Sequence, residues 1–127
     1  NGNLVPLVKM IKCWNKNISF SFNSFHLEVM ALQILDGIRI NDFPSGARYF
    51  FDKAKDYVKK KNPDPAGYND DVGEYLNTDA KISGAISNMT TAYSRAVKAE
   101  SFAQENKIAE AVGEWRKIFG GKFPAFG

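Results

Sequence analysis

Apolar residues recur at intervals of three and four along most of this 127-residue chain, and that spacing limits the folds open to it. The interval places side chains on one face of an α-helix, whereas a half-buried strand alternates with a period of two. No segment alternates in that way, and the sequence has no internal repeats or low-complexity tracts. The pattern therefore predicts an all-α domain of five helices packed as a bundle.

Breaks in the apolar pattern set the expected limits of the helices. Pro6 suits a first turn, Asn23 or Ser24 can cap the second helix, and Asn106 can cap the last. The proline-rich stretch 62–67 cannot be helical, so we expect a rigid loop there. The expected inward residues, helix by helix, are Leu4, Leu7, Val8, Ile11 and Trp14; Leu27, Met30, Ala31, Ile34, Leu35 and Ile38, with Phe25, Val29 and Leu32 on a second side; Ala47, Phe50, Phe51, Ala54, Tyr57 and Val58; Ile82, Ala85, Ile86, Met89, Tyr93, Ala96 and Val97; and Ile108, Ala111, Val112, Trp115 and Phe119.

Composition excludes several classes of function. No apolar run approaches the roughly 20 residues of a membrane span, so we expect no membrane partner. The 17 basic and 14 acidic side chains give a net charge of +3, which does not indicate a nucleic-acid partner. Cys13 and His26 are the only residues of their types, so neither a disulfide nor a Cys/His metal cage can form within the chain. A reducing, cytoplasmic location fits best.

Lys12 and Ser24 are candidate phosphate ligands. Lys12 lies near the edge of the apolar stripe of the first helix, and Ser24 opens the second. An ammonium and a hydroxyl placed at these two helix positions could both contact one phosphate group. The helix dipole and the free amides at a helix N-terminus also favour an anion there. Each residue also has a plainer interpretation, with Lys12 as a surface lysine beside Trp14 and Ser24 as an N-cap.

Neighbouring side chains are assigned mostly structural roles. Phe25 is the one aromatic residue kept as a candidate for contact with a nucleotide, since it directly follows Ser24. Glu28, expected in the first helical turn, can pair with Lys12. His26 is expected to pack rather than to catalyse, and Asp70-Asp71 to cap a helix rather than to hold a metal. The sequence thus assigns no catalytic and no metal-binding residue.

Four short motifs together resemble a known family. They are Leu4 to Asn15, which contains Lys12-Cys13-Trp14; Ser24-Phe25-His26-Leu27-Glu28; Asp64-Pro65-Ala66-Gly67; and Trp115 to Gly120 with Phe123-Pro124. In order and spacing they are similar to the C-terminal helical domain of nucleotidyltransferases. The relatives are bacterial cyclic-oligonucleotide synthases of anti-phage signalling, animal oligoadenylate synthetases and archaeal CCA-adding enzymes. The resemblance implies a substrate-binding domain of the oligoadenylate-synthetase and poly(A)-polymerase type over residues 1–127.

The resemblance also implies roles for the candidate ligands. Lys12 and Ser24 would contact the triphosphate of the donor nucleotide, while a preceding catalytic domain, absent from this chain, would hold magnesium ions and form the phosphodiester bond. We therefore expect this chain alone to be inactive and its partners to be that domain and nucleoside triphosphates. The expected product is a cyclic or linear oligonucleotide second messenger of antiviral defence. Pro6 departs from the family, where a basic or polar residue is frequent.

Two other classes of function are consistent with the same helical periodicities in the sequence. One is a helical protein-interaction module without a ligand. The other is an RNA-binding module in which the lysines of the first helix and Lys59 to Lys61 form a track along the phosphate backbone. A Gly-Ser start and two closely spaced acidic residues encoded upstream would favour the nucleotidyltransferase over both.

Overall fold

The computed structural model describes residues 2–18, 22–58 and 79–121. Within those ranges every regular element is an α-helix, in the order α1 (Leu4–Asn17), α2 (Ser24–Ile34), α3 (Phe43–Tyr57), α4 (Asp79–Gln104) and α5 (Ile108–Phe119). The prediction of an all-α, five-helix domain is therefore confirmed. The predictions for Lys59 to Lys61, the 62–67 loop, Asp70-Asp71 and Phe123-Pro124 lie outside the described residues.

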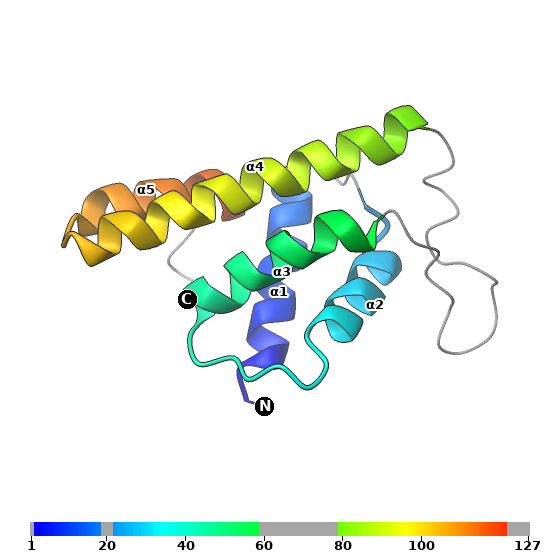
Figure 1. The fold of residues 1–127 in the computed structure, drawn as a ribbon, viewed down its shortest axis with the longest axis horizontal. Coiled ribbons are helices and arrows are strands. Elements are labelled where there is room, and N and C mark those ends of the chain that lie inside the picture. Colours follow the sequence, from blue (N-terminus) through cyan, green and yellow to red (C-terminus); the bar gives the residue numbers. More distant parts are fainter. Residues whose placement is uncertain (1, 19–21, 59–78, 122–127) are drawn as a thin grey trace.

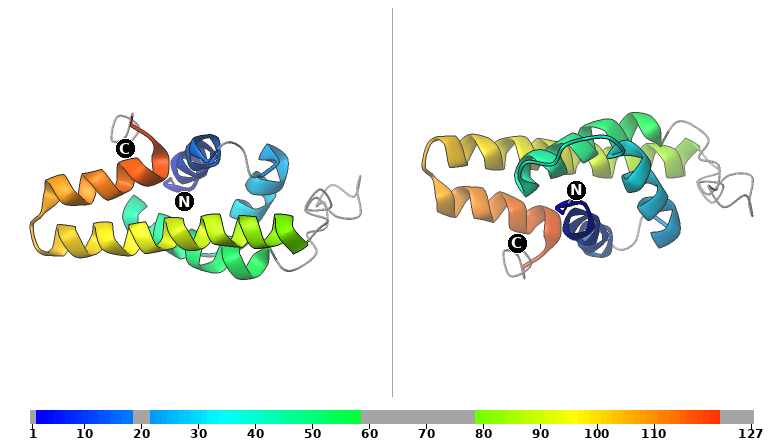
Figure 2. Two further views of the ribbon diagram at one scale, coloured as in Figure 1. Left: turned by 90° about the horizontal axis from the view of Figure 1, so that it is seen from above. Right: turned by 90° about the horizontal axis from the view of Figure 1, so that it is seen from below.

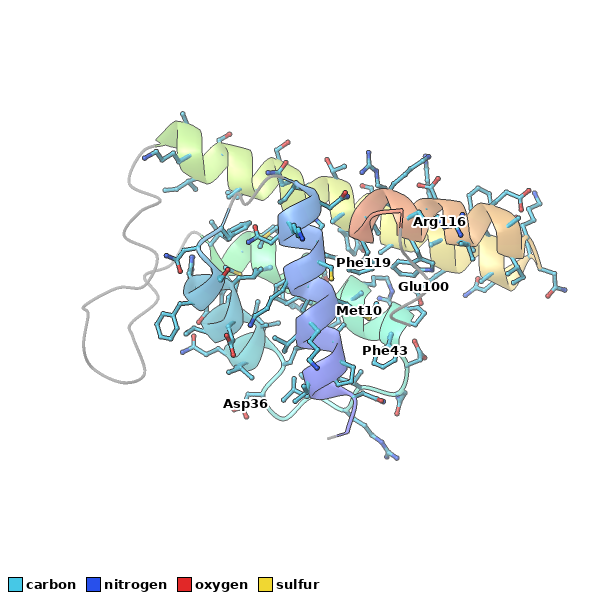
Figure 3. All side chains as sticks on the ribbon, turned by 180° about the vertical axis from the view of Figure 1, so that it is seen from behind. Met10, Asp36, Phe43, Glu100, Arg116 and Phe119 are labelled. Carbon is cyan, nitrogen blue, oxygen red and sulfur yellow. The ribbon has the colours of Figure 1, made fainter. Side chains whose placement is uncertain are left out.

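The helices pack in two groups, with α3, α4 and α5 in one layer and α1 and α2 against it. α4 and α5 run side by side as a hairpin, and α3 lies along α4 (Figures 1 and 2). α1 crosses this layer with α2 on one side and α5 on the other, and it also touches α3 (Figure 3). No helix in the described part of the chain is both long and apolar enough to cross a bilayer. α1 thus connects the α2 side of the molecule to the hairpin.

Aromatic side chains join these helices at the centre of the core. Trp14 of α1 is 1% exposed and meets Phe51 of α3 edge to face, with ring centroids 5.0 Å apart. Phe51 in turn lies 6.4 Å from Phe119 of α5, which stacks on Trp115. Edge-to-face and offset pairs of this kind add to the free energy gained by burying the rings. The predicted core roles of the two tryptophans are confirmed.

Small side chains allow α4 to lie close to its neighbours. Ala85, Ala92, Ala96 and Ala99 are buried along α4, together with Met89. Because alanine projects only a methyl group, α3 and α5 can both pack against this stripe. The alanine-rich sequence of α4 thus serves packing as well as helix propensity.

Two predicted helix boundaries are wrong. α2 ends at Ile34, four residues before the predicted Ile38, and Gly37 beyond it adopts a φ of +71°, which a continuing helix cannot accommodate. Asn106 does not cap α5, because it takes a left-handed conformation with a φ of +61° in the turn after α4. α5 instead begins after Lys107 without a side-chain cap.

Four predicted inward residues are exposed. Ile108 and Val97 are 57% and 41% exposed. Ile108 opens α5 at the end of the hairpin that projects beyond the other helices, so no third helix covers it (Figure 2). Phe25 and Leu32, 49% and 47% exposed, lie on faces of α2 turned away from α1 and α3, the helices that α2 packs against.

Candidate anion-binding site

An ion pair joins α1 to α2 beside the start of α2. Lys12 Nζ lies 3.1 Å from Glu28 Oε2, as the sequence predicted for this pair, although Glu28 is the fifth residue of α2 and not part of its first turn. The two side chains are 44% and 46% exposed. An exposed pair of this kind contributes about 1 kcal/mol or less to stability. Lys12 therefore stays within reach of a dissolved anion that carries more charge than one carboxylate.

Ser24 lies on the same side of α2 as Glu28. The two residues are four apart in one helix, and side chains at that interval are neighbours on its surface, with Cβ atoms about 5–6 Å apart. Since Glu28 contacts Lys12, Ser24 lies one helical turn before the residue that binds the ammonium group. Ser24 is exposed, and its hydroxyl makes no hydrogen bond to any residue that the structure describes. Ser24 and Lys12 thus both lie close to Glu28 along the chain or in space, and their role as ligands stays a prediction.

Asn23, rather than Ser24, is the N-cap of α2. Its Oδ1 accepts hydrogen bonds from the backbone amides of Phe25 at 2.9 Å and His26 at 3.4 Å. The cap therefore already satisfies two of the amides that a bare helix N-terminus would offer to an anion. What remains for an anion here is the positive end of the helix dipole, the Ser24 side chain and the ammonium group of Lys12.

Lysines line the exposed side of α1. Lys9 and Lys16 lie one turn to either side of Lys12, both exposed, and neither makes an ion pair within the described ranges. The first turn of α2 contains no acidic residue. Glu28 is thus the acidic side chain in contact with Lys12, and exposed lysines lie one turn to either side of Lys12 on α1.

The two aromatic rings near the start of α2 have different environments. Phe25 is 49% exposed directly after Ser24, so its ring is available to a ligand at this surface. His26 is fully buried and its ring lies 6.1 Å from that of Phe22. The predicted packing role of His26 is confirmed, and the contact of Phe25 with a nucleotide stays a prediction.

Asn15 is a residue of this site that the sequence reasoning missed. It is 2% exposed, and its side-chain amide pairs with both backbone groups of Phe22, just before the α2 cap. A signal existed in the sequence, because Asn15 follows Ile11 by one turn and so continues the apolar stripe of α1. A polar residue in that place is buried, and buried amides are almost always hydrogen-bonded.

Two hollows lined by described residues include neither Lys12 nor Ser24. One of about 440 Å³ lies between the start of α1 and the end of α2, and its lining includes Leu4 and Leu35. Another of about 260 Å³ lies beside Arg48 and Glu100, which form an ion pair between α3 and α4. Among the described residues no three His, Cys, Asp or Glu side chains converge in a way that could hold a metal ion. The described residues thus provide exposed lysines beside α2 but no metal centre.

Comparison with known proteins agrees with the resemblance carried by these motifs. No protein-family model matches the chain. Over an alignment that covers 98% of its length, the chain is 30% identical to a curated protein of Bacillus cereus strain VD146 named as a probable cyclic nucleotide synthase. The chain spans 38% of that protein's length. The similarity supports a nucleotidyltransferase-like relationship.

Proposed function

We propose that this chain is the nucleotide-binding C-terminal domain of a nucleotidyltransferase and that Lys12 and Ser24 hold phosphate oxygens of the donor triphosphate. The observation that carries the proposal is the 3.1 Å contact between Lys12 and Glu28, since it sets the ammonium group beside the face of α2 that begins with Ser24. The positive end of the α2 dipole adds to the attraction of a polyanion.

The triphosphate replaces Glu28 as the partner of Lys12. A single carboxylate forms a weak, solvent-exposed pair with the lysine, whereas a triphosphate offers several charged oxygens at once. Ser24 donates its hydroxyl hydrogen to a neighbouring oxygen, and the exposed Phe25 ring contacts the nucleotide. Together these contacts orient the nucleotide for in-line attack, which is the main contribution that a protein makes to phosphoryl transfer.

The bond-forming chemistry belongs to an adjoining catalytic domain. The metal-binding carboxylates that two-metal phosphoryl transfer requires have no counterpart among the described residues. The relative is named as a probable cyclic nucleotide synthase and this chain covers 38% of it, which leaves room for such a domain in a protein of that kind. In this proposal the adjoining domain holds the magnesium ions, and the product is a cyclic or linear oligonucleotide.

Three single variants of the complete gene product test the triphosphate contacts. Lys12→Ala removes a charge-assisted hydrogen bond of about 1.5–3 kcal/mol, so we expect affinity for ATP to fall by about 10- to 150-fold. Ser24→Ala removes a neutral bond and costs less, about 0.5–1.5 kcal/mol. Lys9→Ala is the control, since Lys9 lies one turn away on the same helix and changes net charge equally.

Isothermal titration calorimetry and steady-state rates at low and moderate salt give the readout, with melting temperatures to show that each variant is folded. The proposal is contradicted if Lys12→Ala binds ATP as the wild type does while Lys9→Ala binds it more weakly. Equal losses for both lysines, with a steep dependence on salt, would instead favour a nonspecific RNA-binding track.

A further inference from the structure

A buried amide holds Phe22, two residues before α2 begins. Asn15, in the last turn of α1, donates from Nδ2 to the carbonyl oxygen of Phe22 at 2.9 Å. Its Oδ1 accepts from the backbone N–H of the same residue at 3.0 Å. Both ends of the side chain are therefore used on one residue, and with 2% of Asn15 exposed, water cannot substitute for either bond.

The residue that Asn15 holds is itself fixed in place. Phe22 is 2% exposed, and its ring lies between those of Trp14 and His26, with centroids at 5.7 and 6.1 Å. Phe22 directly precedes the cap Asn23, and Ser24 lies only two residues on, at most about 7.6 Å along the chain. The position of Phe22 thus sets where α2 begins relative to α1.

We propose that Asn15 is a positioning residue for the triphosphate site, acting through Ser24 without touching the ligand. The inference rests on the function proposed above. The Lys12–Glu28 pair is exposed and therefore too weak to fix α1 and α2 relative to each other. The buried amide of Asn15, with its two hydrogen bonds, is strong enough to do so. Asn15 therefore holds the start of α2, and with it the hydroxyl of Ser24, in a fixed place relative to Lys12.

A matched residue two positions away separates positioning from general stability. Asn17 is also an asparagine at the end of α1, but its Nδ2 donates to the carbonyl oxygens of Lys117 and Ile118, both at 3.1 Å. It therefore fastens α1 to the end of α5 and not to the start of α2. Replacing it disturbs the same helix end without releasing Ser24.

The test is a double-mutant cycle in the complete gene product, with ATP as the ligand. We expect Asn15→Ala to weaken ATP binding by about three- to tenfold, as much as Ser24→Ala does. In both variants the hydrogen bond from the Ser24 hydroxyl to the phosphate is lost. In the Ser24→Ala background, Asn15→Ala should then cost little further affinity. Asn17→Ala should lower the melting temperature while ATP affinity stays within about twofold of the wild type.

The result that overturns the inference is a lower melting temperature for Asn15→Ala with unchanged ATP affinity, or a loss of affinity that is the same with and without Ser24. An equal loss of affinity in Asn17→Ala overturns it as well. Should Asn15→Ala fail to fold, Asn15→Gln keeps the amide on a side chain one methylene longer, and the same cycle applies. If Lys12→Ala also leaves ATP binding unchanged, the proposed function itself fails; if Lys12→Ala weakens it, only the role of Asn15 is wrong.

Discussion

At the scale of single residues, the candidate site depends on which side chains are paired and how strongly. Lys12 is held by a single exposed carboxylate, whereas Asn15 is held by two buried hydrogen bonds. The first arrangement is easily exchanged for another anion, and the second is not. The surface therefore combines an exchangeable ion pair with a firmly held backbone at Phe22.

Glu28 should act as a weak competitor of the triphosphate. In Glu28→Gln the carboxylate no longer occupies Lys12, so we expect ATP affinity to rise by up to about fivefold, the equivalent of one exposed ion pair. Glu110→Gln on α5, which removes the same charge away from the site, is the control. Calorimetric titration measures both, and weaker ATP binding by Glu28→Gln would mean that Glu28 orients Lys12 for the ligand.

At the scale of helices, the periodicity of the sequence predicted which elements form, but their ends and outer faces depended on tertiary contacts. The spacing of Leu7, Ile11 and Trp14 places α1 correctly because those residues share one face. The end of α2 was missed because the same pattern continues to Ile38 after the chain has turned at Gly37. The exposure of Ile108 was missed because it depends on how far the α4–α5 hairpin extends past its neighbours.

Two helical glycines have different surroundings, one in close contact with a neighbouring helix and one facing open space. A Cβ added to the buried Gly46 of α3 would lie 2.9 Å from Leu7 Cδ2 and 3.0 Å from Ile40 Cγ2, whereas one at Gly84 of α4 meets nothing within 4 Å. We expect Gly46→Ala to lower the free energy of unfolding by about 1–3 kcal/mol through overpacking. Gly84→Ala should raise it by about 0.5–1 kcal/mol, because alanine favours a helix. Urea denaturation of the 127-residue chain measures both, and a stabilising Gly46→Ala would show that α1 and α3 are not in this close contact.

At the scale of the whole molecule, the candidate site lies on the exposed side of α1 and α2 as far as the described residues go. Lys12 and Ser24 are both exposed, and neither lines the two hollows described above. Sequence motifs identified the two ligand candidates because they are separated by a predictable helix, loop and helix start. They could not identify Asn15, since its two hydrogen bonds are made to the backbone of Phe22, seven residues on, and helix periodicity does not predict such a contact.

The most direct test of the central claim is a crystal structure of the complete gene product with a nonhydrolysable ATP analogue and magnesium. The account predicts phosphate oxygens within hydrogen-bonding distance of both Lys12 Nζ and Ser24 Oγ, with Glu28 displaced from the lysine. A triphosphate bound with Lys12 still paired to Glu28 and Ser24 facing solvent would contradict it.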